Sequence, residues 1–429
     1  MSVTKCSSAA EAISVIDSDE YIWTHSMAAT PVILLESLYE HARSKKNITL
    51  MQLHTEQPQE ISPRELEGHL RNRCFFVGSP TRHLVQKGYA DYVPIFLSEV
   101  PLLFRRDYQK VDTVLIQVSP PDKHGMCTLG VSVEATVAAI EKRKKRVIAH
   151  INPSMPRTHG DSFLPYELFD RVYEEEHPIF EHKAHPQTEI TGKIGKLISE
   201  LVEDRSCLQL GIGAIPDAAL SAMHQHKDLG IHTEMFSDGI LHLMEKGVIT
   251  NRYKTIHPHK VVTSFAMGTQ QLYDFIDDNQ EVVFLDVGYT NNTHIIRQNQ
   301  KVVAINSAIQ VDISGQVCAD SIGAKIYSGV GGQMDFMRGA VLSEGGKAII
   351  ALPSTAKNDT ISRIVPLLSP GSGVVTTRAH AHYIITEYGV AKLFGKSLRE
   401  RAKELIKIAH PKFREDLEKQ TREIWDLKI

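Results

Sequence analysis

Runs of β-branched and aromatic residues recur along the chain, and most of them lead into Gly, Pro, Asn or Ser. Short apolar runs that end at turn residues are typical of buried strands. We therefore expect strands at YIWTH (21–25), CFFVG (74–78), DTVLIQVSPP (112–121), RVIAHIN (146–152), EVVFLDVG (281–288), KVVAINS (301–307), KAIIALPS (347–354) and GVVTTRA (373–379).

Between these runs lie segments whose apolar residues repeat every three to four positions, the spacing of a helix with one buried face. Strands that alternate with helices predict an α/β architecture with largely parallel sheets. The acidic, proline-containing segment 163–189 interrupts the alternation, so we place a domain boundary near residue 185. The expected helices are TPVILLESLYEHARSK (30–45), ISPRELEGHLRN (61–72), GVSVEATVAAIEKRKK (130–145) and GKIGKLISELVED (192–204).

The prediction is thus two open α/β domains, 1–185 and 186–429. In each half a β-rich stretch runs into D-x-x-G, at 122–125 and at 312–315. This repeat favours two similar domains, although any strand that ends in a turn gives the same pattern.

Composition and charge narrow the class of protein. The chain has 429 residues, of which 42% are apolar, and 48 basic against 51 acidic residues leave a net charge of −3. No overall field then attracts nucleic acid or an anionic membrane, and we expect neither as a partner. The five cysteines lack CxxC spacing and are odd in number, which suits a reducing compartment. The N-terminus lacks the apolar stretch of a signal peptide, and no apolar window is long enough for a membrane span. We therefore expect a cytoplasmic protein.

Two glycine-rich turns precede expected helices. LQLGIGAIPDAALSAM (208–223) predicts a strand, a turn and a helix with Pro216 in its first turn. It lacks the GxGxxG fingerprint, and close strand–helix packing explains its glycines about as well as a bound phosphate or carbonyl oxygen does. In YSGVGGQMDFMRGA (327–340) we favour a ligand loop over a simple turn, because a turn alone needs one or two glycines and this segment offers Gly329, Gly331 and Gly332.

Glu234 places a carboxylate inside the apolar stretch GIHTEMFSDGI (230–240), about twenty residues after the first glycine turn. A helix and a short return strand would put it at the carboxyl end of a strand, where open α/β sheets build their sites. There it could be a general base, a metal ligand, a helix cap or a nucleophile. We expect no metal, because HExxH is absent and His380 and His382 have no third ligand, so structural histidines are favoured.

The chain also lacks the GxSxG elbow and the P-loop, which argues against a serine hydrolase and against phosphoryl transfer. Seven other motifs follow one another along nearly the whole length: VSPPDKHGMCTLG (118–130), INPSMPRTHGD (151–161), QLGIGAIPDA (209–218), IHTEMFSDG (231–239), NSAIQVDISGQV (306–317), SGVGGQMDF (328–336) and HYIITEYGVA (382–391). With these motifs the chain resembles the acetyl-CoA hydrolase/transferase family of family I CoA-transferases, which contains 4-hydroxybutyrate CoA-transferase and butyryl-CoA:acetate CoA-transferase.

The resemblance implies the CoA-transferase fold, with the active site between the two domains. It implies that Glu234 is a nucleophile that forms an acyl-glutamyl anhydride and then a glutamyl-CoA thioester. Oxyanions form along this path, and the loop 329–332 is the candidate that stabilises them. The implied CoA contacts are Gly211, Ile212, Gly213, Ala214, Ile215, Ile309, Gly332 and Lys357.

For three sets of basic residues, a structural role is the alternative to a role in substrate binding. Lys357 is favoured as a CoA contact over a solvated surface lysine. For the run EKRKKR (141–146), a charged helix end is favoured over a contact with nucleotide phosphates. His25 ends an expected strand, and a substrate-side role and a structural role are about equally supported.

The leading function is transfer of CoA from a short-chain acyl-CoA to a small monocarboxylate such as 4-hydroxybutyrate or butyrate, with acetyl-CoA as the expected donor. No bound cofactor is expected beyond CoA and acyl-CoA as substrates, and from the family we expect a homodimer. An acyl-CoA hydrolase that uses the same intermediate is the first alternative. A non-catalytic CoA-binding protein is the alternative from another class.

Overall fold

The computed structural model of the chain describes residues 3–56, 65–183 and 186–428. Its contacts divide it into two compact units. The first comprises Met1–Lys183, Glu234–Phe236 and Val262–Thr290, and the second comprises Ala184–Thr233, Ser237–Val261 and Asn291–Ile429. The sequence-based boundary near residue 185 treats both domains as continuous, whereas the first unit also includes two internal segments of the second half, Glu234–Phe236 and Val262–Thr290.

An eight-stranded, wholly parallel sheet forms the core of the first unit, in the order β1-β11-β8-β6-β2-β3-β4-β5. Every residue of β6 is buried, as expected of a central strand with both faces covered. The strands are β1 (Thr4–Lys5), β2 (Tyr21–Thr24), β3 (Ile48–Gln52), β4 (Leu70–Cys74), β5 (Asp91–Tyr92), β6 (Thr113–Val118), β8 (Arg146–Ile151) and β11 (Arg171–Glu174).

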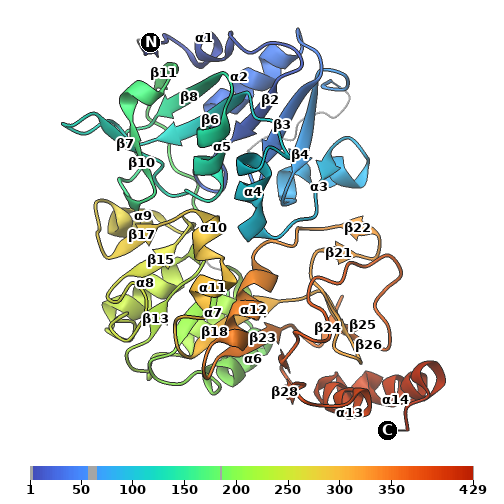
Figure 1. Cartoon of the computed structure of the whole chain (residues 1–429). Coiled ribbons are helices and arrows are strands. Elements are labelled where there is room, and N and C mark those ends of the chain that lie inside the picture. Colours follow the sequence, from blue (N-terminus) through green and yellow to red (C-terminus); the bar gives the residue numbers. More distant parts are fainter. Residues whose placement is uncertain (1–2, 57–64, 184–185, 429) are drawn as a thin grey trace. The chain divides into compact units, whose positions relative to one another are not determined.

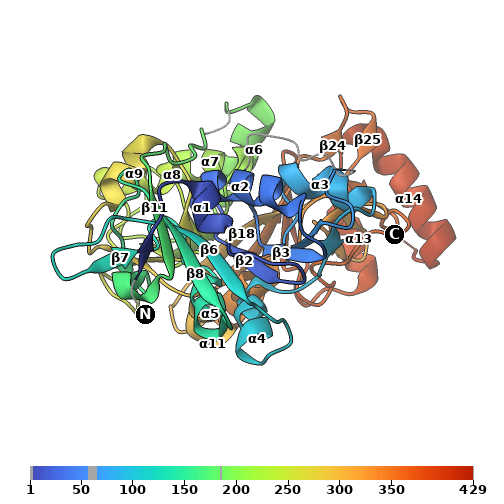
Figure 2. The same cartoon turned by 90° about the horizontal axis from the view of Figure 1, so that it is seen from above.

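Helices lie on both faces of this sheet. Figure 2 shows α1, α2 and α3 on one face and α4 and α5 on the other. Their apolar sides cover the sheet, which explains why the strands read as continuous apolar runs. The bounds are α1 (Ala9–Ile13), α2 (Val32–Ala42), α3 (Ser79–Gln86), α4 (Val100–Arg105) and α5 (Thr136–Lys142), with the 3-10 turns η1 (Leu97–Glu99) and η2 (Tyr166–Leu168).

Smaller pairings complete the first unit. In one of them β14 (Met235–Phe236) runs parallel to β16 (Phe265–Ala266), which brings the segment after Glu234 into this unit. The other elements are β7 (Met126–Thr128) paired with β10 (Phe163–Pro165), the sheet of β15 (Val261–Thr263), β17 (Val282–Phe284) and β9 (His159–Gly160), and the helices α9 (Gln270–Ile276) and α10 (Val287–Thr290).

A six-stranded sheet organises the second unit, in the order β13-β12-β18-β23-β27-β28. Figure 1 labels β13, β18, β23 and β28 of this sheet. Only β28 is antiparallel to its neighbour. The strands are β12 (Cys207–Leu210), β13 (Gly230–Ile231), β18 (Val302–Ser307), β23 (Lys347–Ala351), β27 (Tyr383–Thr386) and β28 (Gly389–Lys392). The helices are α6 (Glu189–Ser199), α7 (Ala214–Ser221), α8 (Asp238–Glu245), α11 (Thr293–Ile296), α12 (Gln333–Leu342), α13 (Leu398–Ile408) and α14 (Pro411–Trp425).

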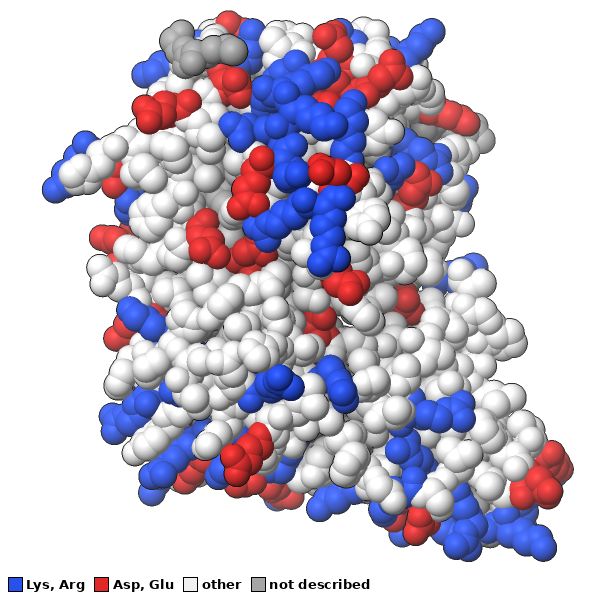
Figure 3. All heavy atoms as spheres, viewed as in Figure 1, with Lys and Arg blue, Asp and Glu red and all other residues white. Residues whose placement is uncertain are grey.

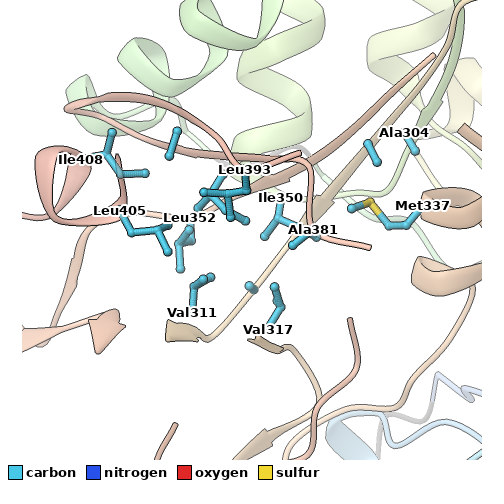
Figure 4. Packing of buried hydrophobic residues seen from close by; sticks show 14 of the residues in the cluster. Ala304, Val311, Val317, Met337, Ile350, Leu352, Ala381, Leu393, Leu405 and Ile408 are labelled. Atoms are coloured by element: carbon cyan, nitrogen blue, oxygen red, sulfur yellow. The ribbon is translucent and has the colours of Figure 1, made fainter. Parts of the chain in front are cut away.

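One large apolar cluster packs the second unit. Figure 4 shows Leu405 and Ile408 of α13 beside Leu352 and Leu393, with Val311 below them. The cluster therefore joins the sheet to the small strands that follow β18, and these strands carry the loops at its edge. They are β19 (Gln310–Asp312), β20 (Val317–Cys318), β21 (Ser321–Ile322), β22 (Lys325–Ile326), β24 (Thr355–Ala356), β25 (Ile361–Ser362) and β26 (Ile364–Val365).

The predicted α/β class with mostly parallel sheets is confirmed, and three expected elements are wrong. CFFVG ends β4 at Cys74 and then turns, so its aromatic residues lie beyond the strand. Among the described residues, GVVTTRA forms only an isolated bridge, between Thr376 and Val317, and the rest of the run pairs with no strand. The helix expected at 61–72 is instead a turn at 65–69 followed by β4, and its residues 61–64 lie outside the described part of the chain.

We predict that Gly195→Ala destabilises the protein by about 1–3 kcal/mol, since overpacking a tight contact costs that much. A Cβ at Gly195 of α6 would lie 2.5 Å from the carbonyl carbon of Ala218, in the backbone of α7. Gly192→Ala in the same helix is the control, because its Cβ would meet only the mobile Gln187 side chain and helix propensity favours alanine. Chemical denaturation of both variants checks this, and equal stability would contradict the close packing.

Candidate active site

Several loops with site candidates leave one edge of the six-stranded sheet. Because β12, β18, β23 and β27 are parallel, their carboxyl ends lie along the same edge. These ends lead into Gly211, Ala308, Leu352 and Glu387, respectively. Ligands of open α/β sheets bind outside the carboxyl ends of the strands. The second unit thus brings three of the predicted CoA-contact segments, Gly211–Ile215, Ile309 and Lys357, to this edge.

The first glycine turn joins β12 to α7. Gly213 has φ +119°, a backbone conformation that residues with a side chain rarely adopt. Gly213 is also the N-cap residue of α7, and because it has no side chain, the helix begins without a side-chain cap. A Cβ on Gly211 or on Gly213 would meet no atom within 4 Å, so open space adjoins the turn. The first N–H groups of α7 and its positive dipole end are therefore available to an anionic group or a polarised carbonyl oxygen.

The second glycine loop, 329–332, leads into α12. Gly331 has φ +58°, and Gly332 forms the N-terminus of α12 without a side-chain cap. Because α12 precedes β23 and runs antiparallel to it, this uncapped end faces the same edge of the sheet as the N-terminus of α7. The buried ring of Phe336, in the first turn of α12, lies 6.3 Å from the ring of His232. The loop is thereby fixed to the stretch that leads to Glu234.

Side chains hold the stretch before Glu234 in place. The N–H of Ile231 on β13 donates to Oδ1 of Asn251 over 2.8 Å, and its carbonyl accepts from Nζ of Lys254 over 2.6 Å. Thr233 then donates from Oγ1 to the carbonyl of Leu210 over 3.0 Å, which ties the stretch to the end of β12. An edge strand has unpaired backbone groups, and here polar side chains satisfy them.

The backbone of Glu234 itself is held from the first unit. Its carbonyl oxygen accepts hydrogen bonds from Oγ1 of Thr263 and from the N–H groups of Ser264 and Phe265, each over 3.0 Å. The residue lies at a bend between β13 and β14, and it is half-buried, whereas Phe236 is fully buried. Glu234 thus follows a strand end as predicted, with its main chain fixed on both sides and its side chain partly accessible.

Lys254 was missed by the sequence interpretation. Only 6% of this lysine is exposed, and its ammonium donates to two carbonyls, those of Ile231 and Lys260, each over 2.6 Å. Burial lowers the pKa of Lys254 to about 8. A single lysine in NRYKTIH carries no sequence signal of such a role, because its partner Ile231 is 23 positions away.

The remaining CoA candidates differ in exposure. Ile309 is half-buried, and its N–H donates to the carbonyl of Cys318 over 2.8 Å. Lys357 is exposed at the tip of the hairpin formed by β24 and β25, and it begins three successive residues with left-handed φ, followed by Asn358 and Asp359. The tip is fixed by a hydrogen bond of 2.5 Å from Oγ1 of Thr355 to Asp359. A defined loop therefore presents the lysine charge to solvent.

His25 is fully buried in the first unit. Its Nε2 lies 2.6 Å from the carbonyl oxygen of Ser132, and its Nδ1 lies 3.3 Å from the N–H of Gln117. A neutral ring with its proton on Nε2 satisfies both contacts, and burial lowers the pKa of His25 to about 4. These contacts favour the structural role over the substrate-side role.

The basic run 141–146 mostly pairs within its own unit. Lys145 and Arg146 bind the carboxylate of Glu20, which is fully buried, and Lys142 binds Asp107 over 3.1 Å. Figure 3 shows Lys and Arg side chains, with acidic ones among them, gathered where Figure 1 draws α4 and α5. These ion pairs favour the interpretation as a charged helix end.

The described residues contain no group of three or more His, Cys, Asp or Glu placed to hold a metal ion. His382 packs against the ring of Phe394 at 4.3 Å, and Nδ1 of His380 bonds to Oγ1 of Thr377. All five cysteines are free thiols. Across the described part of the chain, no helix combines the length and apolar character needed to cross a membrane.

Comparison with known proteins adds independent evidence. Models of the acetyl-CoA hydrolase/transferase N-terminal and C-terminal domains match residues 3–181 and 268–421, and Glu234 lies between these ranges. A succinyl-CoA:acetate/propanoyl-CoA:succinate CoA transferase of Fasciola hepatica is 52% identical over 93% of this chain and 84% of its own length. The 4-hydroxybutyrate coenzyme A transferase of Clostridium kluyveri is 47% identical over 96% of each chain. The crystal structure of 4-hydroxybutyrate CoA-transferase from Porphyromonas gingivalis is 37% identical, with a TM-score of 0.81 over 98% of this chain and 97% of that one.

We predict that His25 makes stability sensitive to acid. Its pKa is about 4 in the folded chain against 6.5 in the unfolded one, so the unfolded state binds more protons between these values. The contribution is fully present above pH 6.5 and is lost as the pH falls towards 4, by on the order of 3 kcal/mol.

Urea unfolding of the protein and of His25→Gln between pH 7.5 and 4.5 tests this prediction. At pH 7 the His25→Gln variant has a lower free energy of unfolding than the parent protein. As the pH falls, the free energy of unfolding of the variant declines less steeply, so the difference in stability between the two proteins becomes smaller. A histidine that titrates near pH 6.5, seen by its ring proton shifts in NMR, would instead indicate a solvated, substrate-side ring.

Proposed function

The chain belongs to the acetyl-CoA hydrolase/transferase family, and on that premise we propose that it transfers CoA from a short-chain acyl-CoA to a small monocarboxylate. Acetyl-CoA is the proposed donor, and 4-hydroxybutyrate or butyrate is the proposed acceptor. The observation that carries the proposal is Glu234, a half-buried carboxylate on a main chain that is fixed on both sides. The mixed α/β fold of the chain, with mostly parallel sheets, is shared with the solved 4-hydroxybutyrate CoA-transferase.

The proposed reaction begins at the carboxylate of Glu234. One of its oxygens attacks the acyl-CoA carbonyl, the C–S bond breaks, and an acyl-glutamyl anhydride and the CoA thiolate result. The thiolate attacks the glutamyl carbonyl, which expels the first acid as a carboxylate and leaves a glutamyl-CoA thioester. The incoming carboxylate attacks this thioester and forms a new anhydride. The released thiolate then attacks the new acyl carbonyl, which completes the product thioester and regenerates Glu234.

Each attack creates an oxyanion, and the two uncapped helix ends supply donors for such a charge. The loop 329–332 before α12 is the proposed oxyanion site, because Phe336 of that helix packs on His232, two residues before Glu234. Loss of one such donor typically costs about 3 kcal/mol of transition-state stabilisation. The turn Gly211–Ile215, Ile309, Gly332 and Lys357 are the proposed CoA contacts.

We also propose the cofactor requirement, the compartment and the oligomeric state of the protein. No cofactor is required beyond CoA and acyl-CoA as substrates, since the glutamate carries the acyl group and then the CoA. The five free thiols fit a reducing compartment, and we place the protein in the cytoplasm. We also propose a homodimer, which the mass of the native protein in solution would test.

We predict that Glu234→Gln lowers kcat for CoA exchange by a factor of about 10³ or more, because an amide cannot form the anhydride. Glu245→Gln is the matched control, since it makes the same change on an exposed residue of α8. After incubation with acetyl-CoA alone, mass spectrometry should find CoA on the peptide that contains Glu234 of the unmodified protein and not of the variant. Full turnover by Glu234→Gln would discard the nucleophile.

Initial rates separate transfer from hydrolysis. A transferase needs the acceptor acid for steady CoA exchange and gives parallel double-reciprocal lines, as expected for a ping-pong mechanism. Release of CoA from acetyl-CoA at the same rate with and without the acid would instead identify a hydrolase. Binding of CoA with neither activity would identify a non-catalytic protein.

A further inference from the structure

Arg363 lies at the same edge of the six-stranded sheet and has no assigned role. Its own backbone is held on both sides: its N–H donates to the carbonyl of Ser354 over 2.8 Å, and its carbonyl accepts from Val311 over 2.9 Å. Ser354 follows β23, and Val311 belongs to β19, which follows β18. The base of the guanidinium side chain is therefore fixed between two loops that leave the carboxyl ends of adjacent strands.

The guanidinium is half-buried and poorly matched by the protein. Its Nη1 makes one long contact of 3.4 Å with the carbonyl of Ala308, and its Nε is buried without a hydrogen-bond partner. It forms no ion pair with any residue in the described ranges 3–56, 65–183 and 186–428. Arginine carries five donors, so most of its capacity is unused.

The nearby anionic group is already engaged. The carboxylate of Glu387 accepts from the N–H of Ser354 over 2.9 Å and from its Oγ over 2.5 Å. Burial lowers the pKa of Arg363, and the neighbouring Glu387 and Tyr327 partly offset this effect. Arginine stays protonated in proteins, so the charge remains without a bonded counter-ion among the described residues, which is an unfavourable arrangement unless something else binds it.

We propose that Arg363 binds an anionic oxygen group of the substrates, and this inference rests on the proposed function. The planar fork of arginine fits two oxygens of a phosphate or of a carboxylate. Two sources offer this chemistry: the phosphates of the CoA nucleotide and the carboxylate of the acid substrate. Ala308, whose carbonyl contacts Arg363, is next to Ile309 in the chain. Arg363 directly follows the hairpin of β24 and β25, which carries Lys357 at its tip. An exposed and a half-buried cation therefore lie at one edge of the sheet.

The experiment compares Arg363→Met, Arg363→Lys and a control, Lys392→Gln, which removes one charge from an exposed position of β28. Arg363→Met keeps most of the side-chain length without charge, so the ligand-free protein should melt at the same temperature as the parent protein or higher. A structural role predicts a lower melting temperature. With substrate, KM should rise about 10- to 100-fold with a smaller change in kcat, and Arg363→Lys should recover part of the loss.

Substrate analogues identify the source of the anion. If Arg363 binds a phosphate, KM of the Arg363→Met variant rises with acetyl-CoA and does not rise with acetyl-pantetheine, which has no phosphate. If that phosphate is the 3′-phosphate, the rise is smaller with acetyl-dephospho-CoA. If the carboxylate is bound, KM for the acid rises with every thioester. The CoA-induced increase in melting temperature should fall in the variant only in the first case.

Unchanged KM values for the acid and for all thioesters would overturn the inference, as would a ligand-free Arg363→Met protein that is clearly less stable. These outcomes are distinct from failure of the proposed function, because CoA exchange by the parent protein is measured in the same series. If the parent protein exchanges CoA and Arg363→Met binds normally, only the role of Arg363 is rejected. If the parent protein exchanges no CoA between acids, the proposed function is rejected instead.

Discussion

The hydrogen bonds around residues 231–234 are the constraint on which the candidate site depends. β13 is the edge strand of its sheet, so one side of its backbone has no neighbouring strand. Asn251 and Lys254 satisfy both polar groups of Ile231 on that side, and Thr263 with its two following residues saturates the carbonyl of Glu234. A short stretch that would otherwise fray is thereby held in one conformation.

Local electrostatics at this edge differs from the balance of the whole chain. The net charge of −3 gives no overall attraction for an anion. Two uncapped helix N-termini nevertheless face the carboxyl edge of the six-stranded sheet, and a hairpin there carries Lys357 at its tip and is followed directly by Arg363. Helix ends and buried cations act over a few ångströms, so a polyanion such as CoA can be bound locally by a protein that is slightly acidic overall.

The sequence predicted the parts of the fold that depend on local pattern. KVVAINS and RVIAHIN became β18 and β8, because a continuous apolar run fits a strand that is covered on both faces. GVVTTRA has an equally strong β-branched pattern, but it pairs with no strand among the described residues, so the strand predicted from this pattern is wrong. Glu234 and the glycine turns were singled out as site candidates by their motifs, whereas Lys254 and Arg363 make their contacts with Ile231 and Ala308, which lie 23 and 55 positions away.

The fixed backbone also bears on how a carboxylate can act as a nucleophile. A carboxylate in water is strongly hydrated, and a flexible one would lose conformational entropy each time it reached the acyl carbonyl. Here hydrogen bonds hold the main chain on both sides of Glu234, so in the proposed mechanism only its own side-chain torsions remain to be restricted on binding. Glu234 is half-buried, and Phe236, two positions further along the chain, is fully buried. In the proposed mechanism, a half-buried acid at a fixed bend meets two opposing needs, access for the substrate and exclusion of water, which neither a surface glutamate nor a fully buried one could meet.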